Sequence, residues 1–494
     1  MEEGLRGKDL MTALKAGYAH FWCHTYEPER TIDLIEGFLE EYSKSEDARP
    51  WRVSFKWGVG TESEDPMQPL EALKGEAPYS IGILKNYHWF LEKESRDYPV
   101  LTQALLDNAK RWRSKEDRKA VVVVSPVPKG QGLPKELHKD FVPVEFGLPD
   151  EKEIEGLVDR AIDKAESIGV EINGEKRRRL VVAAKGMTRQ EIENALWFCL
   201  VKERDLDPRV LNRMKAATLE ETAGLKYIEP NVTFGGVIGY ERLKEFAVKM
   251  VRSPLSLGML FVGPPGCGKT MFMSALGNES GLPVYEIEFG TIFGSLVGES
   301  EAKMSRLIDT IKAIGECLIL LDEFEKGIAG VGGSGNTDSG VTKKTIAQWL
   351  KFMNSDNRPR GVRIYGTCND IRAIPPEYLR AERWDCAPFY IGLPNDEAKS
   401  EMVEHYKLTY SILGDEELSA AEMKGWSGAE IKSCCRIASA MGTSLRAAKA
   451  FIKPIGKIAR ESLEFLERAV KEDRFNLAEE VLGDELFEDR EVEI

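Results

Sequence analysis

The chain has few of the features that mark secreted, zinc-binding or membrane-spanning proteins. Its eight cysteines include no pair spaced as CxxC, so neither a disulfide framework nor a zinc site is predicted. No apolar run approaches the roughly 18 residues of a membrane helix, and the beginning, MEEGLRGKDL, lacks the profile of a signal peptide. We therefore expect a cytoplasmic protein with reduced cysteines and no membrane partner.

An excess of positive charge is also missing. Acidic residues number 82 against 68 basic ones, which gives a net charge of −14. Because affinity for nucleic acid comes mainly from neutralisation of phosphates by lysine and arginine, this composition argues against a dominant nucleic-acid surface. Two basic stretches, Lys110–Arg113 and Lys176–Arg179, leave nucleic-acid remodelling as one alternative.

What the sequence does contain is a phosphate-binding loop between an apolar run and a helix-compatible stretch that begins at Met271. Its eight residues are Gly263, Pro264, Pro265, Gly266, Cys267, Gly268, Lys269 and Thr270. Glycines let backbone N–H groups wrap phosphates, a lysine at this position reaches the β- and γ-phosphates, and the hydroxyl ligates Mg²⁺. The loop predicts binding and hydrolysis of a nucleoside triphosphate, with ATP and Mg²⁺ as cofactors. Cys267 lies at a helix N-terminus, which favours a thiolate, so oxidation there is a further hypothesis.

The second half of such a site should be a buried strand that ends in carboxylates. Residues 317–321 form an apolar run, and Asp322 and Glu323 follow it. Asp322 is predicted to hold the Mg²⁺ shell, and Glu323 to orient and deprotonate the attacking water.

From Val232 to Ala440 the sequence resembles the AAA ATPases, whose Walker A and Walker B motifs correspond to these two halves. The resemblance implies adenine contacts at Ile238 and Gly239, a sensor at Asn369, and lid contacts to the nucleotide at Gly428 and Ala429. It also implies that Arg380 and Arg383 are arginine fingers which reach the nucleotide of a neighbouring subunit, so that an isolated protomer has an incomplete site. Self-association into a ring or spiral, as a hexamer, follows from this resemblance.

An internal repeat relates the first 200 residues to the second half of the chain. Four segments echo four others in the same order, 237 to 245 residues further on. The pairs are SIGILKNYH from Ser80 and CLILLDEFE from Cys317, AVVVVSP from Ala120 and VRIYGTC from Val362, PVEFGLPD from Pro143 and PFYIGLPN from Pro388, and GMTRQEIENAL from Gly186 and GWSGAEIKSCC from Gly425.

The first copy has lost the groups that the chemistry requires. Lys85 and Asn86 occupy the positions of Asp322 and Glu323, and no glycine-rich loop with Lys-Thr precedes them. We predict a degenerate ATPase-like domain that serves scaffolding, docking or regulation. Whether it still binds nucleotide is left open.

This layout is similar to one AAA branch, the hypothetical chloroplast reading frame forty-six family. The resemblance rests on residues 292–301, 338–340 and 375–377. Within the first of these, Leu296, Val297 and Gly298 are pore-loop candidates, although protein-threading relatives place an aromatic residue where Leu296 stands, which grips polypeptide better than leucine.

The predicted fold is α/β, with two tandem AAA-type modules, each a parallel sheet flanked by helices and followed by a small helical lid. The boundaries are residues 1–150 for the degenerate domain, 151–205 for its lid, 206–230 for a linker, 231–394 for the active core, 395–450 for its lid, and 451–494 for a C-terminal helix and acidic tail. The favoured function is an oligomeric ATPase that remodels an unidentified protein client. The alternative is a slow nucleotide-controlled switch or scaffold that docks a partner through the first domain.

Overall fold

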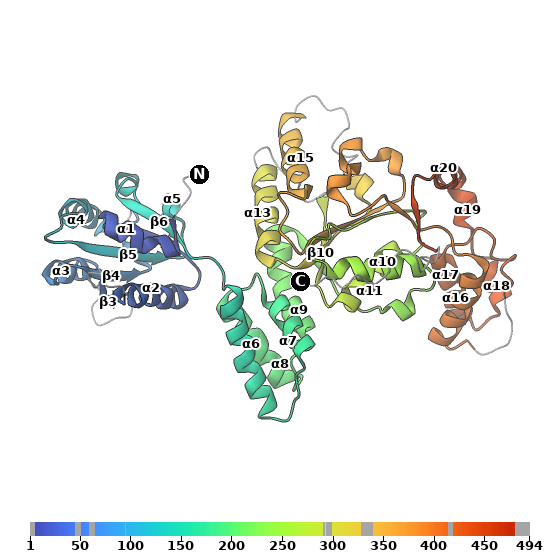
Figure 1. The fold of residues 1–494 in the computed structure, drawn as a ribbon, viewed down its shortest axis with the longest axis horizontal. Helices are drawn as coiled ribbons and strands as arrows, with labels where there is room; N and C mark the ends of the chain where they lie inside the picture. Colours follow the sequence, from blue (N-terminus) through green and yellow to red (C-terminus); the bar gives the residue numbers. More distant parts are fainter. Residues whose placement is uncertain are drawn as a thin grey trace. The chain divides into compact units, whose positions relative to one another are not determined.

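The computed structural model describes residues 5–44, 51–58, 65–93, 95–289, 292, 299–327, 339–412 and 418–479. The chain divides into two compact units (Figure 1). The first unit comprises residues 1–153 and 188–193, and the second unit comprises residues 154–187 and 194–494. The pore-loop candidates Leu296, Val297 and Gly298 and the acidic tail from residue 480 lie outside the described residues.

The first unit is a parallel sheet with helices on both faces. Its strand order is β1-β6-β2-β5-β4-β3. Apolar side chains alternate between two core clusters, one shared with helices α1 and α2 and the other with α3 and α4. Because both faces are covered, the central strand β5 is buried at every residue, as its run AVVVV predicts. The bounds are β1 Leu5–Arg6, α1 Leu10–Ala16, β2 His20–His24, α2 Pro28–Ser43, β3 Arg52–Trp57, α3 Gln68–Gly75, β4 Ser80–Lys85, α4 Tyr98–Arg111, β5 Lys119–Ser125, α5 Lys129–Gly132 and β6 Phe141–Glu145.

The second unit contains a larger sheet of the order β13-β12-β8-β11-β10-β9-β7. Helices α10 and α11 pack on one face, and α9, α13, α15 and α20 contribute to the cluster on the other face. The bounds are α9 Pro208–Ala223, β7 Leu225–Ile228, α10 Glu241–Arg252, β8 Leu260–Val262, α11 Lys269–Ser280, β9 Val284–Ile287, α13 Glu299–Ile314, β10 Cys317–Leu321, α15 Ser339–Met353, β11 Val362–Cys368, β12 Phe389–Tyr390, α20 Arg460–Lys471 and β13 Asn476–Leu477.

The sheets confirm the predicted two-module α/β fold and its internal repeat. Strands β2 to β6 of the first unit lie in the order β6-β2-β5-β4-β3, and β8 to β12 lie in the same order, β12-β8-β11-β10-β9. The residue aligned with Glu323 shares even its backbone conformation, since Asn86 has a φ of 54° and Glu323 has a φ of 47°. Positive φ values at residues other than glycine are uncommon, so the match supports common descent of the two modules.

The repeat between the segments that begin at Gly186 and Gly425 is also visible in the structure. Thr188 and Glu191 cap helix α8 (Arg189–Lys202) reciprocally, and Ser427 and Glu430 do the same for α17 (Gly428–Met441). This capping box satisfies two N–H groups at each helix start.

The helices predicted as the lid of the first module pack largely with the second unit. Residues 154–187 belong to that unit, with α6 Glu151–Glu166 and α7 Gly174–Ala184. The ammonium of buried Lys215 donates to the carbonyls of Ala183 and Lys185, each at 2.9 Å. The carbonyls at the C-terminal end of α7 are therefore satisfied by a side chain of α9 (Pro208–Ala223).

The segment 206–230, predicted as a linker, instead forms helix α9 (Pro208–Ala223) and edge strand β7. Asp207 caps the helix, Pro208 occupies its first turn, and Gly224 ends it with a φ of 66°. These are standard helix boundary signals, but the high charge of the segment obscured them. Strand β7 then pairs antiparallel with β9, so the segment is part of the second sheet.

The C-terminal region contains the lid helices of the second unit and the last strand of its sheet. Lid helices α16 (Asp396–Thr409), α17 and α18 (Leu445–Lys449) share one core cluster. Helices α19 (Ile455–Ile458) and α20 (Arg460–Lys471) follow, and Leu466 and Ala469 of α20 pack in the sheet cluster. Strand β13 (Asn476–Leu477) then pairs with β12.

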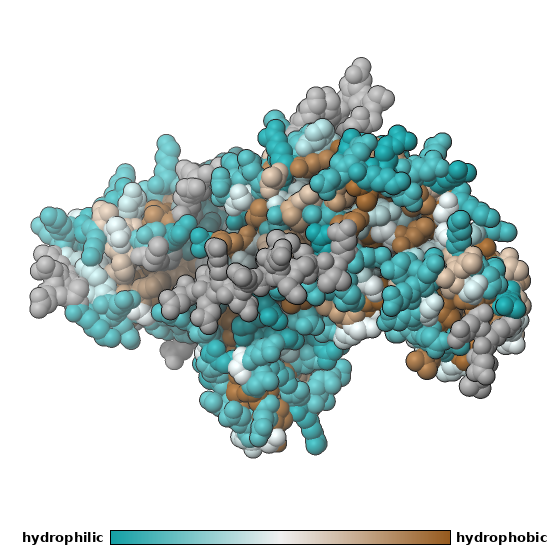
Figure 2. All heavy atoms as spheres, turned by 45° about the vertical axis from the view of Figure 1, so that its right-hand side comes forward, coloured by the Kyte–Doolittle hydropathy of each residue, from teal (hydrophilic) through white to brown (hydrophobic). Residues whose placement is uncertain are grey.

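Hydrophilic side chains predominate on the face drawn in Figure 2. Among the described residues, no helix combines the length and the apolar character needed to cross a membrane.

Candidate nucleotide-binding site

The predicted phosphate-binding loop connects β8 to α11 and can be built only with glycine at several positions. Gly266 and Gly268 have φ values of 82° and 86°, in the left-handed region. A Cβ atom at Gly263 would lie 1.9 Å from the carbonyl oxygen of Ile391. The loop thus keeps its backbone N–H groups at the start of α11, where a helix favours anions.

Lys269 is held inside this loop. Its ammonium donates to the carbonyl oxygens of Gly263 at 2.8 Å and Pro264 at 2.9 Å, and to Oδ1 of Asn369 at 2.9 Å. Burial lowers the pKa of Lys269, because removal from water penalises the charged form. The contact to Asn369 joins the loop to the residue that is predicted as the sensor.

Thr270 and Asp322, the predicted Mg²⁺ ligands, face each other. The Thr270 hydroxyl lies 3.2 Å from each carboxylate oxygen of Asp322. The hydroxyl of Thr367 donates to Asp322 Oδ1 as well. A hydroxyl beside a carboxylate fits the oxygen ligands that Mg²⁺ prefers, with water and phosphate oxygens completing its shell. Sequence reasoning missed Thr367, whose only signal is its place two residues before Asn369.

Glu323 lies between these groups and the sensor. Its backbone N–H donates to the Thr367 hydroxyl at 2.9 Å, and Asn369 Nδ2 approaches Glu323 Oε1 at 3.5 Å. Its side chain is 46% exposed and pairs with Lys326 at 2.6 Å. One carboxylate oxygen is therefore near the sensor amide, and the exposure gives water access to the group.

Glu325 is a further residue that the sequence analysis did not single out. It is 6% exposed, and its Oε1 accepts a hydrogen bond from the Asn369 backbone N–H at 3.0 Å. Because Asn369 contacts both Lys269 and Glu323, a carboxylate behind its backbone fixes the position of the sensor. Glu325 is thus a positioning residue.

Glu325→Leu is expected to lower kcat of ATP hydrolysis about tenfold, since a buried N–H left without an acceptor costs about 1–3 kcal/mol. Glu325→Gln keeps an acceptor oxygen and should retain most of the activity. Steady-state kinetics on both variants test this, with KM expected to change less than kcat. Equal losses in the two variants would contradict the assignment.

A cavity of about 340 Å³ adjoins the loop and could accommodate the base. Its lining includes Ile238, Pro265, Met271, Gly428 and Ala429, as predicted, together with the unpredicted Val237, Tyr240, Met402, Tyr406 and Lys432. The Ala429 N–H donates to the Gly266 carbonyl at 3.0 Å, which ties the lid to the loop. Predicted Gly239 is not among the lining residues; it has a φ of 81° and supports the turn before α10.

Cys267 does not have the environment expected for a reactive thiolate. Its side chain is buried, and burial raises its pKa to about 12. The hydroxyl of Tyr240 donates to the carbonyl oxygen of Cys267 at 2.9 Å. Burial thus disfavours the thiolate that the oxidation hypothesis requires, because desolvation outweighs the effect of the helix N-terminus.

The two predicted arginine fingers differ in environment. Arg380 is exposed, whereas Arg383 is 8% exposed, and its Nε and Nη1 have no hydrogen-bond partner within the described part of the chain. Burial, and next the charge of Arg380, lower the pKa of Arg383. A guanidinium group with two donors that lack an acceptor within the described residues suits an anionic ligand.

The segment that carries these arginines is firmly held by two residues that sequence reasoning missed. The guanidinium of Arg358 donates to the carbonyls of Met353 and Arg383, at 2.6 and 2.9 Å. Asp385 accepts from the Leu257 N–H at 2.7 Å and from the Ser256 hydroxyl at 2.6 Å. The arginine segment is therefore anchored to the residues that lead into β8.

The corresponding place in the first unit lacks the phosphate-binding loop. Only residues 25–27 separate β2 from α2, where residues 263–268 separate β8 from α11. The first turn of α2 carries Glu29, and Lys85 at the end of β4 pairs with it at 2.8 Å. An acidic residue thus lies near the helix start that corresponds to the predicted phosphate site of the second unit, and a cation stands where Asp322, the predicted metal ligand, stands in that unit.

Photolabelling with 8-azido-ATP should therefore modify no peptide from residues 5–153. Repulsion by Glu29 and the missing glycine loop are the physical reasons. Peptide mapping by mass spectrometry measures the outcome, with wild type as the positive control for labelling in the second unit. A labelled peptide around His24 or Lys85 would contradict this prediction.

Comparisons with known proteins agree with this geometry. Residues 7–146 match the SpoVK-like AAA ATPase N-terminal domain, residues 152–222 the SpoVK-like AAA ATPase second domain, and residues 259–388 the ATPase family associated with various cellular activities, AAA.

Several relatives share this organisation. The uncharacterized AAA domain-containing protein ycf46 of Guillardia theta is 27% identical over 86% of this chain and 85% of its own length, and that of Trieres chinensis is 25% identical over 86% of each. A cell division cycle protein 48 homolog of Archaeoglobus fulgidus is 26% identical over 63% of this chain and 46% of its own length. Residues 259–388 thus match the AAA ATPase family, and over most of its length the chain is similar to the ycf46 proteins.

Proposed function

We propose that the protein hydrolyses ATP and uses the cycle, as an oligomer, to remodel a protein client. The observation that carries this proposal is the convergence of Lys269, Thr270, Asp322, Glu323 and Asn369 at one edge of the second sheet. ATP with Mg²⁺ supplies the phosphoryl group that is transferred to water.

In this proposal each residue has a separate task. The loop backbone and Lys269 bind the phosphates, and Thr270 and Asp322 hold the metal ion. Glu323 takes a proton from water, because its carboxylate is exposed on one side and lies near the Asn369 amide on the other. Asn369 holds that water and the Lys269 ammonium in position without adding charge.

The neighbouring subunit is proposed to complete the site through Arg380 and Arg383. The free donors of Arg383 favour this assignment. A buried guanidinium without acceptors is costly, and the γ-phosphate of an adjacent protomer would satisfy it. The anchored backbone around Asp385 would keep both groups at fixed positions, so that little order must be gained at the moment of reaction.

A slow nucleotide-controlled switch is the second candidate, favoured by the first unit. That unit keeps the sheet of an ATPase but has an ion pair between Glu29 and Lys85 in place of the phosphate loop. A module with the fold and without the chemistry suits a docking surface.

The two candidates differ in how activity depends on assembly. We expect the ATPase rate per chain to rise with protein concentration as oligomers form, because the arginines act in trans. Rate measurements over a dilution series, with mass photometry on the same samples, test this. A low rate that stays constant while the oligomer fraction changes would favour the switch.

A further inference from the structure

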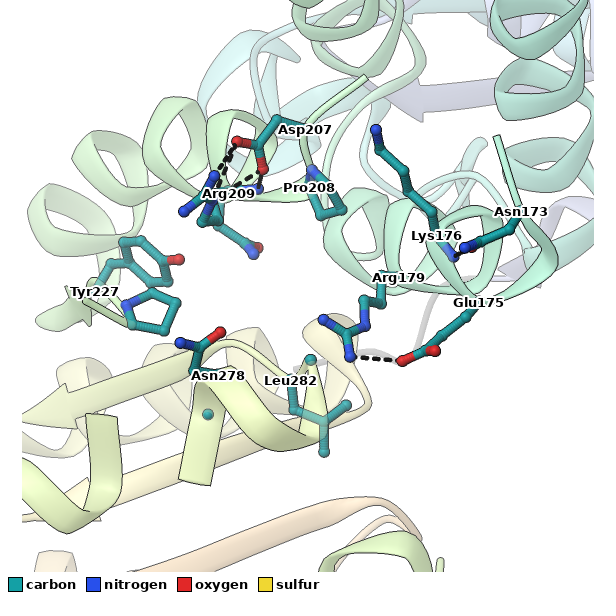
Figure 3. Close-up of a pocket in the computed structure, with 14 residues that line it drawn as sticks. Asn173, Glu175, Lys176, Arg179, Asp207, Pro208, Arg209, Tyr227, Asn278 and Leu282 are labelled. Atoms are coloured by element: carbon teal, nitrogen blue, oxygen red, sulfur yellow. Dashed lines mark hydrogen bonds and ion pairs between the residues drawn. The ribbon is translucent and has the colours of Figure 1, made fainter. Parts of the chain in front are cut away.

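The second unit contains another cavity, which shares no lining residue with the nucleotide site. Its volume is about 370 Å³. It lies between the N-terminal turns of α7 and α9, the residues after β7, and the C-terminal end of α11 (Figure 3). None of the tasks assigned above uses it.

Three cations line this cavity, each paired with an acid, and two of those acids, Glu175 and Asp207, line it as well. Lys176 lies 2.6 Å from Asp205, Arg179 pairs with Glu175 at 2.5 Å, and Arg209 pairs with Asp207 at 2.9 Å. The three carboxylates are 44%, 64% and 24% exposed. Exposed ion pairs contribute about 0–1 kcal/mol, so an anionic ligand could replace Asp205 and Glu175 at small cost, whereas Asp207 also caps α9 and would stay in place.

Two polar atoms at the cavity lack a partner within the described residues. Nε of Arg179 is a buried donor without an acceptor, and Oδ1 of Asn212 is a buried acceptor without a donor. Asn212 is only 6% exposed. Buried polar atoms are normally hydrogen-bonded, so a ligand with both an acceptor and a donor would satisfy the pair.

The position of Arg179 is fixed by its packing. A Cβ atom at Gly281 would lie 2.5 Å from Arg179 Nε, so the guanidinium rests directly on the backbone that ends α11. Figure 3 shows Arg179 extending into the space, with Tyr227 and Arg209 across from it and Leu282 beneath. The aromatic ring of Tyr227 and the side chain of Leu282 offer apolar surface beside the charges.

We propose that this cavity binds a phosphate-bearing small molecule of nucleotide size. Arg179, Lys176 and Arg209 would receive the phosphate, since guanidinium forks match its oxygens. Tyr227 and Asn212 would contact the ring. The size follows from the volume, which is close to that of the nucleotide cavity in the same unit.

Calorimetric titration with ADP tests this proposal in the full chain carrying Lys269→Ala, which disables the phosphate loop. We expect binding to persist and to weaken at least about tenfold in Arg179→Ala, because hydrogen bonds to charged groups contribute about 1.5–3 kcal/mol. The matched control is Arg178→Ala, one residue earlier on α7 and outside the cavity lining.

A second pair of variants keeps the test decisive if Arg179→Ala misfolds. Arg209→Ala removes a cation from the opposite wall, and Arg213→Ala removes one from the same helix, α9, outside the lining. ADP affinity should fall in the former and not in the latter, with thermal unfolding as a check on all four. Absence of binding in Lys269→Ala, or equal affinity in each pair, would overturn the proposal. Because hydrolysis is not measured, such a failure leaves the proposed ATPase function untouched.

Discussion

Glu323→Gln should lower the rate of ATP hydrolysis about 10²-fold or more, because loss of a general base costs about 10²–10⁴-fold. Nucleotide affinity should stay close to that of wild type. The amide has the shape of the carboxylate but cannot take a proton from water. Within the described residues, Glu323 forms no hydrogen bond with Lys269 or Thr270, so the phosphate loop should be unchanged. Phosphate release gives the rate, and titration with a fluorescent ATP analogue gives the affinity.

The matched control is Glu316→Gln at the opposite end of the same strand. Glu316 precedes β10 and lies 3.9 Å from Arg178 and from Lys185, so the same chemical change there should leave turnover nearly unaltered. Full turnover in Glu323→Gln would show that another group accepts the proton. A loss of affinity equal to the loss of rate would instead point to a disturbed phosphate loop.

The sequence predicted the groups that are contiguous in the chain and missed those that meet across strands. The loop residues and the Asp322-Glu323 pair follow from local pattern, because glycines and an apolar strand are visible in single segments. The missed residues are Thr367, Glu325, Asp385 and Arg358. The first three act through contacts between residues 44 to 129 positions apart. Arg358 donates to backbone carbonyl groups. Such contacts depend on strand order, which the motifs did not give.

Domain boundaries were predicted less well for a related reason. Repeat matching divides a chain by descent, whereas packing divides it by contact. The repeated segment Gly186–Leu196 correctly identified a lid helix. However, the hydrogen bond from Lys215 to Ala183 and the close packing of Gly186 on Ile314 attach much of that lid to the second unit. A Cβ atom at Gly186 would lie 3.2 Å from the Cα of Ile314. Descent from an ATPase module therefore did not preserve an independent first module.

Mixing two inactive variants should restore part of the ATPase activity if the site is shared between subunits. Arg383→Ala keeps Lys269 and Glu323 but cannot complete a neighbour's site, and a trans-acting arginine contributes about 10³–10⁵ in rate. Glu323→Gln lacks the base but still offers Arg383. In a mixed oligomer, an Arg383→Ala protomer that receives the arginine of a Glu323→Gln neighbour has every group that the reaction needs.

The recovered rate should depend on the mixing ratio, with a maximum at an intermediate ratio and none in either pure sample. Arg372→Ala serves as the matched control, because Arg372 is exposed and pairs with Asp370 at 2.7 Å within its own chain. That variant should be active alone. If mixtures of Arg383→Ala and Glu323→Gln stay inactive while pull-down of affinity-tagged Arg383→Ala recovers untagged Glu323→Gln, Arg383 acts within its own chain. The unpaired Nε and Nη1 would then reflect a structural arginine that stabilises the segment before Asp385, and the dependence of activity on assembly would need another cause.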